Sequence, residues 1–346
     1  MPGPDPRALR TRPDAMSPGQ AAPAPAPEDP VTAWRRLTGA AERILDTQRL
    51  KRNNRTQVHR LELRAPAQSV IAKRCRARAA LLEHAVYTEI LDRRRLRAPA
   101  LYGFGPDPFT DDGHAYYWLF MEDLGPRRHD PSSEAERRGL AQWLGTLGAL
   151  TAATSQTYGA PDRRLPYYGA FLGDAADGLL RLTRQRTVSP SVRELIDDVV
   201  RAVGRVEAGW ARLESLADDA PSVIAHGDCL PKNIHVTGDA VVPIDWGSVG
   251  VGLPGADLGV SSVWFDQARE VDPCVEAYAA AIRPAWPDVS AAVVRRLALA
   301  GRVLWALKLV AQSVPGFEFY ATAKVETNLR LYSSLLRRST EELLVE

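Results

Sequence analysis

Val223–Trp246 reads VIAHGDCLPKNIHVTGDAVVPIDW and brings three polar side chains toward one small volume. Asp228 lies in a loop, and Asn233 follows it five residues later. Two short strands then flank Thr237-Gly238-Asp239, a sequence typical of a tight hairpin turn. Because the hairpin returns the chain, we expect Asp245, at the end of the second strand, to come close to Asn233. The segment therefore predicts two carboxylates and one amide around a common point.

This set of side chains matches the requirements of phosphoryl transfer. One carboxylate has to orient the attacking hydroxyl and accept its proton. An amide oxygen and a second carboxylate have to hold Mg²⁺, a hard cation that prefers oxygen ligands. The alternative is an unrelated turn followed by an unrelated aspartate, which would have to produce the whole pattern by chance.

The pattern H-G-D-x-x-x-x-N, followed by I-D-W, resembles the family of aminoglycoside phosphotransferases and choline kinases, whose fold is similar to that of the protein kinases. The resemblance implies that Asp228 is the catalytic base and that Asn233 and Asp245 bind Mg²⁺. It also implies ATP or GTP as the co-substrate and a hydroxyl-bearing molecule as the acceptor.

A lysine and a glutamate extend the resemblance on the nucleotide side. Lys73 ends the apolar stretch Val70-Ile71-Ala72 and matches the strand lysine that holds the α- and β-phosphates of the nucleotide. The alternative for a lone lysine is a solvated surface group. Its expected partner lies on the next helix, where Glu83 and Glu89 are candidates. Glu83 is preferred because a tyrosine follows it four residues later, as in the family pattern.

Other residues of the nucleotide site follow from the same resemblance. The stretch LFMEDL at residues 119–124 resembles the hinge between two kinase lobes. Backbone groups near Met121, Glu122 and Leu124 are expected to hydrogen-bond adenine, so the side chains there do not indicate which purine binds. His226 and Asp257 are expected to support the catalytic loop structurally.

The loop that covers the phosphates in this family falls at residues 52–56 and contains no glycine in this chain. Asn53 and Asn54 tolerate left-handed backbone geometry, so a tight turn is still expected. Arg55, or Arg52, would then contact the phosphates directly. The missing glycine also motivates a different hypothesis, a kinase-fold binding module that transfers nothing.

The whole chain predicts an α+β, two-lobed, protein-kinase-like fold. Residues 1–30, rich in Pro and Ala, are expected to form a disordered tail. Residues 31–124 are expected to form a small, β-rich nucleotide-binding lobe. Residues 125–346 are expected to form a larger helical lobe that carries the catalytic loop, one β-hairpin and the acceptor site.

Hydrophobic periodicity and turn signals place individual elements. In the first lobe they predict two strands, Gln57–Arg64 and Gln68–Arg74, joined by the turn Ala65-Pro66-Ala67. A helix at Ala77–Leu96 and a third strand at Tyr116–Met121 are expected to follow. In the second lobe Ser133 and Ser191, each followed by a glutamate three residues later, predict two helix starts with capping boxes. Ser290 begins another, amphipathic helix.

Composition limits the other classes of function. A length of 346 residues suffices for two lobes, and a net charge of +2 is too small to indicate binding of nucleic acid. The three cysteines form no CxxC pair, which argues against a disulfide framework and a zinc site. The best apolar run, Leu297–Val310, is interrupted by Arg302 and Lys308 and falls short of the ~18 residues that span a bilayer. A cytoplasmic location is therefore expected, with no membrane partner.

One motif is typical of a different fold, the dinucleotide-binding fold. Gly250–Gly255 reads G-x-G-x-x-G, the signature of a dinucleotide-binding turn. No parallel strand follows about twenty residues later, as that fold requires, and Pro254 stiffens the turn. The motif is interpreted as part of a substrate-side loop.

The acceptor is left open by the sequence. The acidic side chains after Trp264 are Asp266, Glu270, Asp272 and Glu276. They would suit a polycationic aminoglycoside, although one face of an amphipathic helix is the preferred interpretation. Arg127, Arg128 and His129 would favour an anionic acceptor. An antibiotic, a sugar, an amino alcohol or a Ser/Thr of a peptide are all compatible, and the oligomeric state is undetermined.

Overall fold

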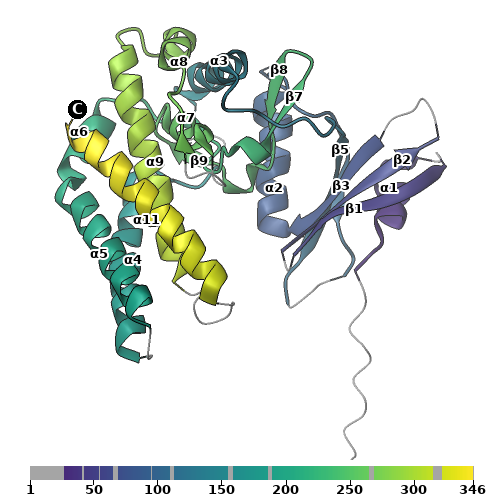
Figure 1. Ribbon diagram of the computed structural model, residues 1–346. Coiled ribbons are helices and arrows are strands. Elements are labelled where there is room, and N and C mark those ends of the chain that lie inside the picture. The colour runs from purple at the N-terminus through teal and green to yellow at the C-terminus, as the bar shows by residue number, and fades with distance from the viewer. Residues whose placement is uncertain are drawn as a thin grey trace, which may run out of the picture.

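The computed structural model has a sheet-containing lobe and a helical lobe (Figure 1). It describes residues 27–40, 43–53, 55–64, 69–94, 96–109, 113–154, 159–185, 189–264, 269–314 and 322–345. Four sequence-based expectations lie outside the described residues, namely those for residues 1–26 of the tail, Asn54, the turn Ala65-Pro66-Ala67 and Asp266.

The smaller lobe contains a five-stranded antiparallel sheet with the order β1-β2-β3-β5-β4. Its strands are β1 (Ile44–Arg52), β2 (Thr56–Leu63), β3 (Ser69–Arg76), β4 (Leu101–Pro106) and β5 (Tyr116–Glu122). The three predicted strands are confirmed as β2, β3 and β5. Lys73 lies on the central strand, opposite Val58 of β2 and Leu119 of β5. Its side chain is therefore held by a well-paired part of the sheet.

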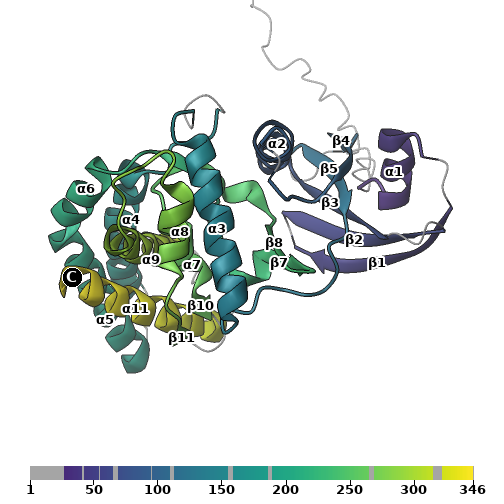
Figure 2. The same ribbon diagram turned by 90° about the horizontal axis from the view of Figure 1, so that it is seen from above.

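A helix that the sequence did not predict, α1 (Pro30–Thr38), packs on this sheet (Figure 2). Asp29 caps it by accepting hydrogen bonds from the N–H groups of Val31 and Thr32. Proline at the first helical position suits a helix start. The buried Trp34 ring lies 5.2 Å from the Phe120 ring. Ordered structure therefore begins before residue 31, because this short helix has a core contact in the sheet.

The helix predicted over Ala77–Leu96 is shorter and is not uniform. It consists of α2 (Ala77–Ala85) and a π-helical segment, η1 (Val86–Leu91). Such segments are rare and are frequently found at functional sites. Tyr87 lies in this segment, and its hydroxyl donates to the Glu83 carboxylate at 3.2 Å.

The larger lobe is built around α9 (Ala291–Ser313), which is buried along most of its length. The other helices are α3 (Glu134–Thr151), α4 (Leu165–Gln185), α5 (Pro190–Ala208), α6 (Trp210–Asp218), α7 (Ala256–Ser261), α8 (Val275–Ile282) and α11 (Thr322–Val345). The predicted helix after Ser290 is confirmed, but it is central to the lobe and is not amphipathic. Among the described residues, no helix combines the length and apolar character needed to cross a membrane.

Glycines allow α7 and α9 to pack in close contact. A Cβ atom on Gly259 would lie 1.8 Å from the Ala298 carbonyl oxygen, and one on Gly301 would lie 2.3 Å from the Ala256 carbonyl oxygen. Because α7 carries Asp257, this contact fixes the position of Asp257 against the core of the lobe.

The predicted helix starts are partly correct. Ser133 caps α3 and Ser290 caps α9, each by accepting a backbone hydrogen bond three residues on. The capping box predicted at Ser191 is wrong. Ser189 is the cap of α5, because it accepts from the Val192 N–H and Pro190 occupies the first helical position.

Three two-stranded antiparallel ribbons complete the described part of the larger lobe. They pair β6 (Val223–Ala225) with β9 (Gly250–Gly252), β7 (Ile234–Thr237) with β8 (Ala240–Pro243), and β10 (Val263–Trp264) with β11 (Arg269–Glu270). The sequence predicted only the β7–β8 hairpin, which is confirmed. The glycine motif begins on β9, whose antiparallel partner is β6, so it is not the first turn of a parallel dinucleotide-binding sheet.

Candidate active site

The candidate active site lies on the chain between β6 and α7, which faces the smaller lobe. Figure 2 shows β7 and β8 between α3 of the larger lobe and the sheet of the smaller lobe. Gly227 opens the catalytic loop with a φ of 75°, a conformation that side chains other than glycine rarely adopt. A Cβ atom there would also lie 2.4 Å from the Ser248 carbonyl oxygen. The glycine of the H-G-D motif is therefore required by both conformation and space.

The structure brings Asp228 and Asn233 together. The Asn233 side-chain amide donates to the Asp228 carboxylate at 3.1 Å and to the Asp228 carbonyl at 2.9 Å. The Ile244 N–H donates to the Asn233 carbonyl at 2.8 Å, which places Asn233 beside the residue that precedes Asp245. The convergence predicted from the hairpin is thus present in the backbone pairing. The side-chain NH₂ group of Asn233 faces Asp228, so the side-chain oxygen, Oδ1, is available for a cation.

His226 and Asp257 hold the loop through backbone contacts. Asp257 accepts hydrogen bonds from the N–H groups of His226 (2.6 Å) and Gly227 (3.0 Å). The Asp228 N–H donates to His226 Nδ1 at 3.3 Å, so the ring proton lies on Nε2, which donates to the Ile244 carbonyl at 2.8 Å. Both ring nitrogens of His226 are therefore engaged within the protein.

A buried ion-pair cluster joins the two lobes. Lys73 Nζ lies 2.6 Å from Glu83 and 2.7 Å from Asp245, although Asp245 is 172 residues away in the sequence. Glu83 is buried, whereas Glu89 is exposed, so Glu83 is the partner of Lys73. Burial lowers the pKa of the Lys73 ammonium, but the two carboxylates outweigh it and raise that pKa above its usual value. The Lys73 ammonium therefore stays protonated between the two acids.

Asp245 has an unusual backbone that the sequence does not reveal. It has a φ of 67° and is the only described residue other than glycine with a positive φ. Such a conformation costs on the order of 1–3 kcal/mol and is concentrated at functional sites. Burial raises the pKa of its carboxyl, but the Lys73 ammonium lowers the pKa to about 2, so the group is ionised at neutral pH.

The Asp245 and Asn233 oxygens suit Mg²⁺, which usually takes one or two carboxylates together with phosphate and water oxygens. Among the described residues, no cluster of three His, Cys, Asp or Glu side chains suited to holding a metal ion is found. A carboxylate–amide pair of this kind depends on the nucleotide phosphates to complete the coordination.

The turn between β1 and β2 is stabilised by a side chain in place of glycine. Asn53 Oδ1 accepts hydrogen bonds from the N–H groups of Arg55 (2.9 Å) and Thr56 (2.8 Å). The Asn53 N–H donates to the Thr56 carbonyl at 2.9 Å. An Asx turn of this type closes a tight loop without left-handed geometry at Asn53. The Arg55 side chain projects from this turn to the cavity that contains Asp228.

The hinge stretch follows β5 as expected. Met121 and Leu124 are buried, and the Glu122 N–H donates to the Ala100 carbonyl at 2.8 Å. That N–H is therefore not available to adenine. The Glu122 carboxylate pairs with Arg97 at 2.7 Å, which anchors the hinge to the smaller lobe. A contact with adenine here would use the Glu122 carbonyl and the Leu124 N–H.

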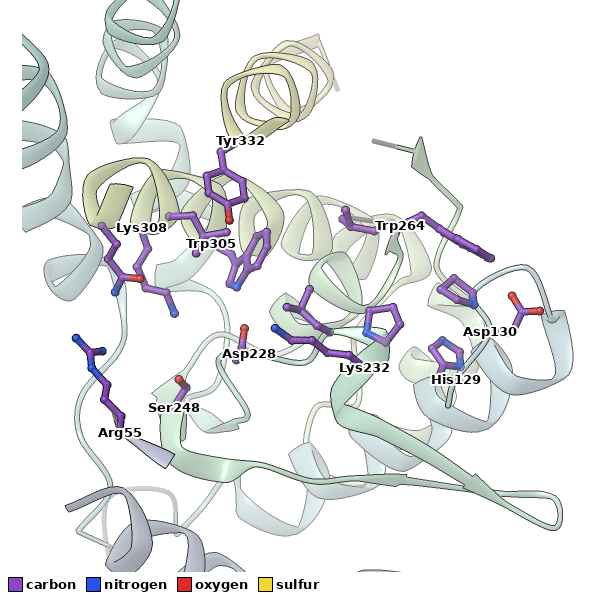
Figure 3. A pocket seen from close by; sticks show the side chains of 16 residues that line it. Arg55, His129, Asp130, Asp228, Lys232, Ser248, Trp264, Trp305, Lys308 and Tyr332 are labelled. Atoms are coloured by element: carbon purple, nitrogen blue, oxygen red, sulfur yellow. The ribbon is translucent and has the colours of Figure 1, made fainter. Parts of the chain in front are cut away.

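A cavity of about 770 Å³ opens beside Asp228 (Figure 3). Trp305 of α9 and Tyr332 of α11 line one side, and Lys308 of α9 and Lys232 of the catalytic loop line others. Sequence reasoning missed Trp305, Lys308 and Tyr332 as site residues. The sequence does show that Lys308 interrupts an apolar helix, and a buried lysine needs a polar environment. That feature argues against a membrane span and also indicates a polar site near Lys308.

The charged stretches weighed for the acceptor are mostly paired with protein groups. Glu270 pairs with Arg338 at 2.8 Å and with Arg302 at 3.5 Å. The amphipathic helix expected for this acidic set is wrong, because Glu270 lies on β11 and, of the three described members, only Glu276 lies on a helix, α8. Strand pairing with β10 overrides the local pattern.

The arginines of the basic stretch after the hinge also contact protein side chains. Arg127 pairs with Glu136 at 2.6 Å, and the Arg128 side chain contacts His235. Of the three residues considered for an anionic acceptor, only His129 lines the cavity. Burial lowers its pKa.

The model of the phosphotransferase enzyme family, APH, matches residues 46–292. The match spans more than half of the chain, so the chain belongs to this family, as the H-G-D-x-x-x-x-N and I-D-W motifs predicted. The chain is therefore a phosphotransferase that acts on a hydroxyl acceptor. No curated protein sequence matches it.

Solved structures of small-molecule kinases share the fold. Spectinomycin phosphotransferase, in complex with ADP and spectinomycin, matches with a TM-score of 0.61 at 9% identity, over 90% of this chain and 97% of that chain. Choline kinase from Cryptosporidium parvum Iowa II matches with a TM-score of 0.54 at 11% identity, over 87% and 88%. Amicoumacin kinase, in complex with AMP-PNP, Ca²⁺ and its ligand, matches with a TM-score of 0.53 at 13% identity, over 87% of each chain. These matches confirm the predicted two-lobed, kinase-like α+β fold.

Proposed function

We propose that this phosphotransferase moves the γ-phosphate of ATP or GTP, with Mg²⁺, to a hydroxyl of a small molecule, and that Asp228 is the catalytic base. The observation that carries the proposal is the joint placement of Asp228, Asn233 and the Lys73–Asp245 ion pair around the open side of the catalytic loop. Phosphoryl transfer depends mainly on positioning and charge stabilisation, and this set provides both.

Asp228 takes the acceptor proton. The acceptor oxygen attacks the γ-phosphorus, the bond from that phosphorus to the bridging oxygen breaks, and the nucleoside diphosphate leaves with the electron pair. The Asn233 NH₂ group, 3.1 Å from the Asp228 carboxylate, orients that carboxylate toward the acceptor. His226 and Asp257 fix the backbone of the loop, so the base is held before the acceptor arrives.

The nucleotide is held by the cleft between the lobes. Lys73 binds the α- and β-phosphates while Glu83 keeps its ammonium in place. Asp245 and Asn233 hold Mg²⁺, which neutralises phosphate charge when it is bound. Adenine or guanine contacts the backbone of the hinge at Glu122 and Leu124. Arg55 reaches the phosphates from the Asn53 turn and replaces contacts that glycine backbone would make.

Ligands bound in solved structures of similar fold support the proposed nucleotide, the divalent cation and the class of acceptor. Neighbours in fold were solved with ADP or with AMP-PNP and Ca²⁺, which supports a nucleotide co-substrate and a divalent cation. Their acceptors, spectinomycin and amicoumacin among them, support a small hydroxyl compound. The complete set of polar residues argues against a binding module that transfers nothing.

The substitution Asp228→Asn tests this proposal. We expect kcat for release of nucleoside diphosphate to fall by about a thousandfold, because a positioned general base contributes about 10²–10⁴-fold. Binding of MgATP, measured by calorimetry, should stay within about threefold, since Asp228 does not hold the nucleotide. The assay screens sugars, amino alcohols, antibiotics and serine peptides as acceptors.

Asp239→Asn is the matched control, because it makes the same chemical change at an exposed turn residue of the β7–β8 hairpin. It should leave turnover unchanged. Wild-type turnover by Asp228→Asn would show that the base is misassigned. If the wild type binds MgATP tightly but releases no nucleoside diphosphate with any acceptor, the result would favour the binding module.

A further inference from the structure

Lys308 differs from the other buried cationic side chains in the described part of the chain. The buried lysines and arginines are Lys73, Arg74, Arg302 and Lys308. The first three each have a carboxylate within ion-pair distance, at Glu83, Asp107 and Glu270 respectively. Among the described residues, no carboxylate lies within 4.0 Å of Lys308 Nζ. An ammonium that is buried without a counter-charge is costly.

The Lys308 ammonium faces the cavity beside the proposed base. Its side chain is 6% exposed and lines the cavity, and its Nζ donates one hydrogen bond, to the Gly227 carbonyl at 3.2 Å. An ammonium has three N–H donors, so two remain for a ligand. Burial lowers the pKa of Lys308 and outweighs the attraction of the Asp228 and Asp257 carboxylates, neither of which lies within ion-pair distance.

Other charges of the cavity reinforce this positive centre. Lys232 and Arg55 also line it, and its acidic side chains are Asp130 and Asp228. The Asp130 carboxylate accepts from the Ser132 N–H (2.8 Å) and hydroxyl (2.7 Å), which hold it in its own turn as an anion. Asp228 is the proposed base. Counted together, the three cations Arg55, Lys232 and Lys308 outnumber these two acids, so the cavity lining favours a ligand with a negative charge.

The apolar part of the cavity is aromatic. Trp305 and Tyr332 stand on one side of Asp228, and Trp264 lies farther along the same cavity (Figure 3). Aromatic side chains of this kind suit a flat ring, which stacks or packs edge-on. The cavity therefore combines a flat apolar wall with an ammonium within reach of it.

We propose that the acceptor is an anionic hydroxyl compound with a flat or ring-shaped body, and that Lys308 is a specificity-determining residue that binds its negative group. The ring lies against Trp305 and Tyr332, and the hydroxyl faces Asp228. This assignment rests on the proposed phosphotransfer at Asp228. It disfavours a polycationic acceptor, because such a molecule would have to place positive charge next to Lys308 and Lys232.

Three probes of similar shape and different charge test the assignment. They are para-hydroxymethylbenzoate, benzyl alcohol and para-aminomethylbenzyl alcohol, which carry a negative, no and a positive charge beside the same primary alcohol. Binding to the full-length chain with MgADP present is followed by tryptophan fluorescence. We expect the benzoate to bind at least about tenfold more tightly than benzyl alcohol, as charge-assisted hydrogen bonds allow, and the amine to bind most weakly.

Variants connect this ranking to Lys308. Lys308→Met should remove the preference for the benzoate, and Lys308→Arg should retain most of it. Lys51→Met, at an exposed lysine of β1, is the control and should leave the ranking unchanged. If Lys308→Met does not fold, the wild-type ranking decides alone.

Several results would overturn the assignment. A benzoate that binds no more tightly than the amine, or that does not bind, would overturn the anionic acceptor. An unchanged ranking in Lys308→Met, with weaker MgATP binding, would assign the lysine to the nucleotide phosphates instead. The ranking is independent of turnover, so a wild type that ranks the probes as expected but transfers nothing would contradict only the proposed phosphotransfer.

Discussion

Two buried lysines differ in whether a carboxylate pairs with their ammonium group. Lys73 lies between the lobes with Glu83 and Asp245 at 2.6 and 2.7 Å, so its charge is balanced by protein groups. Lys308 lines the cavity beside Asp228, and its ammonium donates to the Gly227 backbone carbonyl. The Lys73 ammonium therefore has counter-charges from the protein before any ligand binds. The Lys308 ammonium has no carboxylate within ion-pair distance among the described residues, and for this reason we propose that an anionic ligand binds it.

The difference separates two tasks of one enzyme. A nucleotide is the constant partner of a kinase, so its lysine is held in position by acids from both lobes. An acceptor is the variable partner, and the residues that we propose for its recognition lie on helices α9 and α11, outside the family motifs. Removing each lysine should therefore have different consequences for stability.

Lys73→Met should give the largest effect. It leaves Glu83, which is buried, without its counter-charge, and removal of one partner of a buried pair typically costs about 3–5 kcal/mol. The free energy of unfolding, measured by urea titration, should fall by about that amount. The kcat/KM for MgATP should fall as well.

The matched control for this variant is Arg283→Met, which removes an exposed cation outside this cluster. It should change the free energy of unfolding by less than about 0.5 kcal/mol. Equal losses in the two variants would mean that the interlobe cluster contributes no more to stability than an ordinary surface charge.

The pH dependence of stability should have opposite signs for the two lysines. Burial lowers the folded pKa of Lys308 below 10.5, so below that pH the unfolded chain holds more protons and stability rises with pH. The acids that surround Lys73 raise its folded pKa above 10.5, so above that pH the folded chain holds more protons and stability falls. Each slope is at most about 1.4 kcal/mol per pH unit.

Urea titrations from about pH 8 to about pH 11, compared with those of the two methionine variants, measure these slopes. Lys308→Met should lose the rise below 10.5, and Lys73→Met should lose the fall above it. Difference curves of the same sign for both lysines would contradict the comparison.

Lys308→Met should give the smallest change in stability at neutral pH. It removes a buried cation that has no acid partner and leaves no orphan charge, so the free energy of unfolding should change by about 1 kcal/mol or less, in either direction. Thermal unfolding without acceptor measures it. A loss as large as that of Lys73→Met would mean that the contact with the Gly227 carbonyl is a major structural bond.

The sequence predicted the parts of the molecule that local patterns specify. The spacing of His226, Asp228 and Asn233, with the hairpin that follows, identified the family and the class of reaction. Strand alternation located β2, β3 and β5. The helix α1 was missed because its apolar face has few residues, and the start of α5 was misplaced because Pro190 moved the cap to Ser189.

Residue types and their spacing were enough to identify the segment around Asp228, the kinase-like fold and the candidate partner of Lys73. Those features depend on residues at short separations, where chain geometry leaves few alternatives. The left-handed backbone of Asp245 and the position of Lys308 next to Gly227, 81 residues away, became known only from the folded chain. Such contacts depend on how α9 packs across the lobe, and a lysine in an apolar helix does not by itself indicate which cavity it faces.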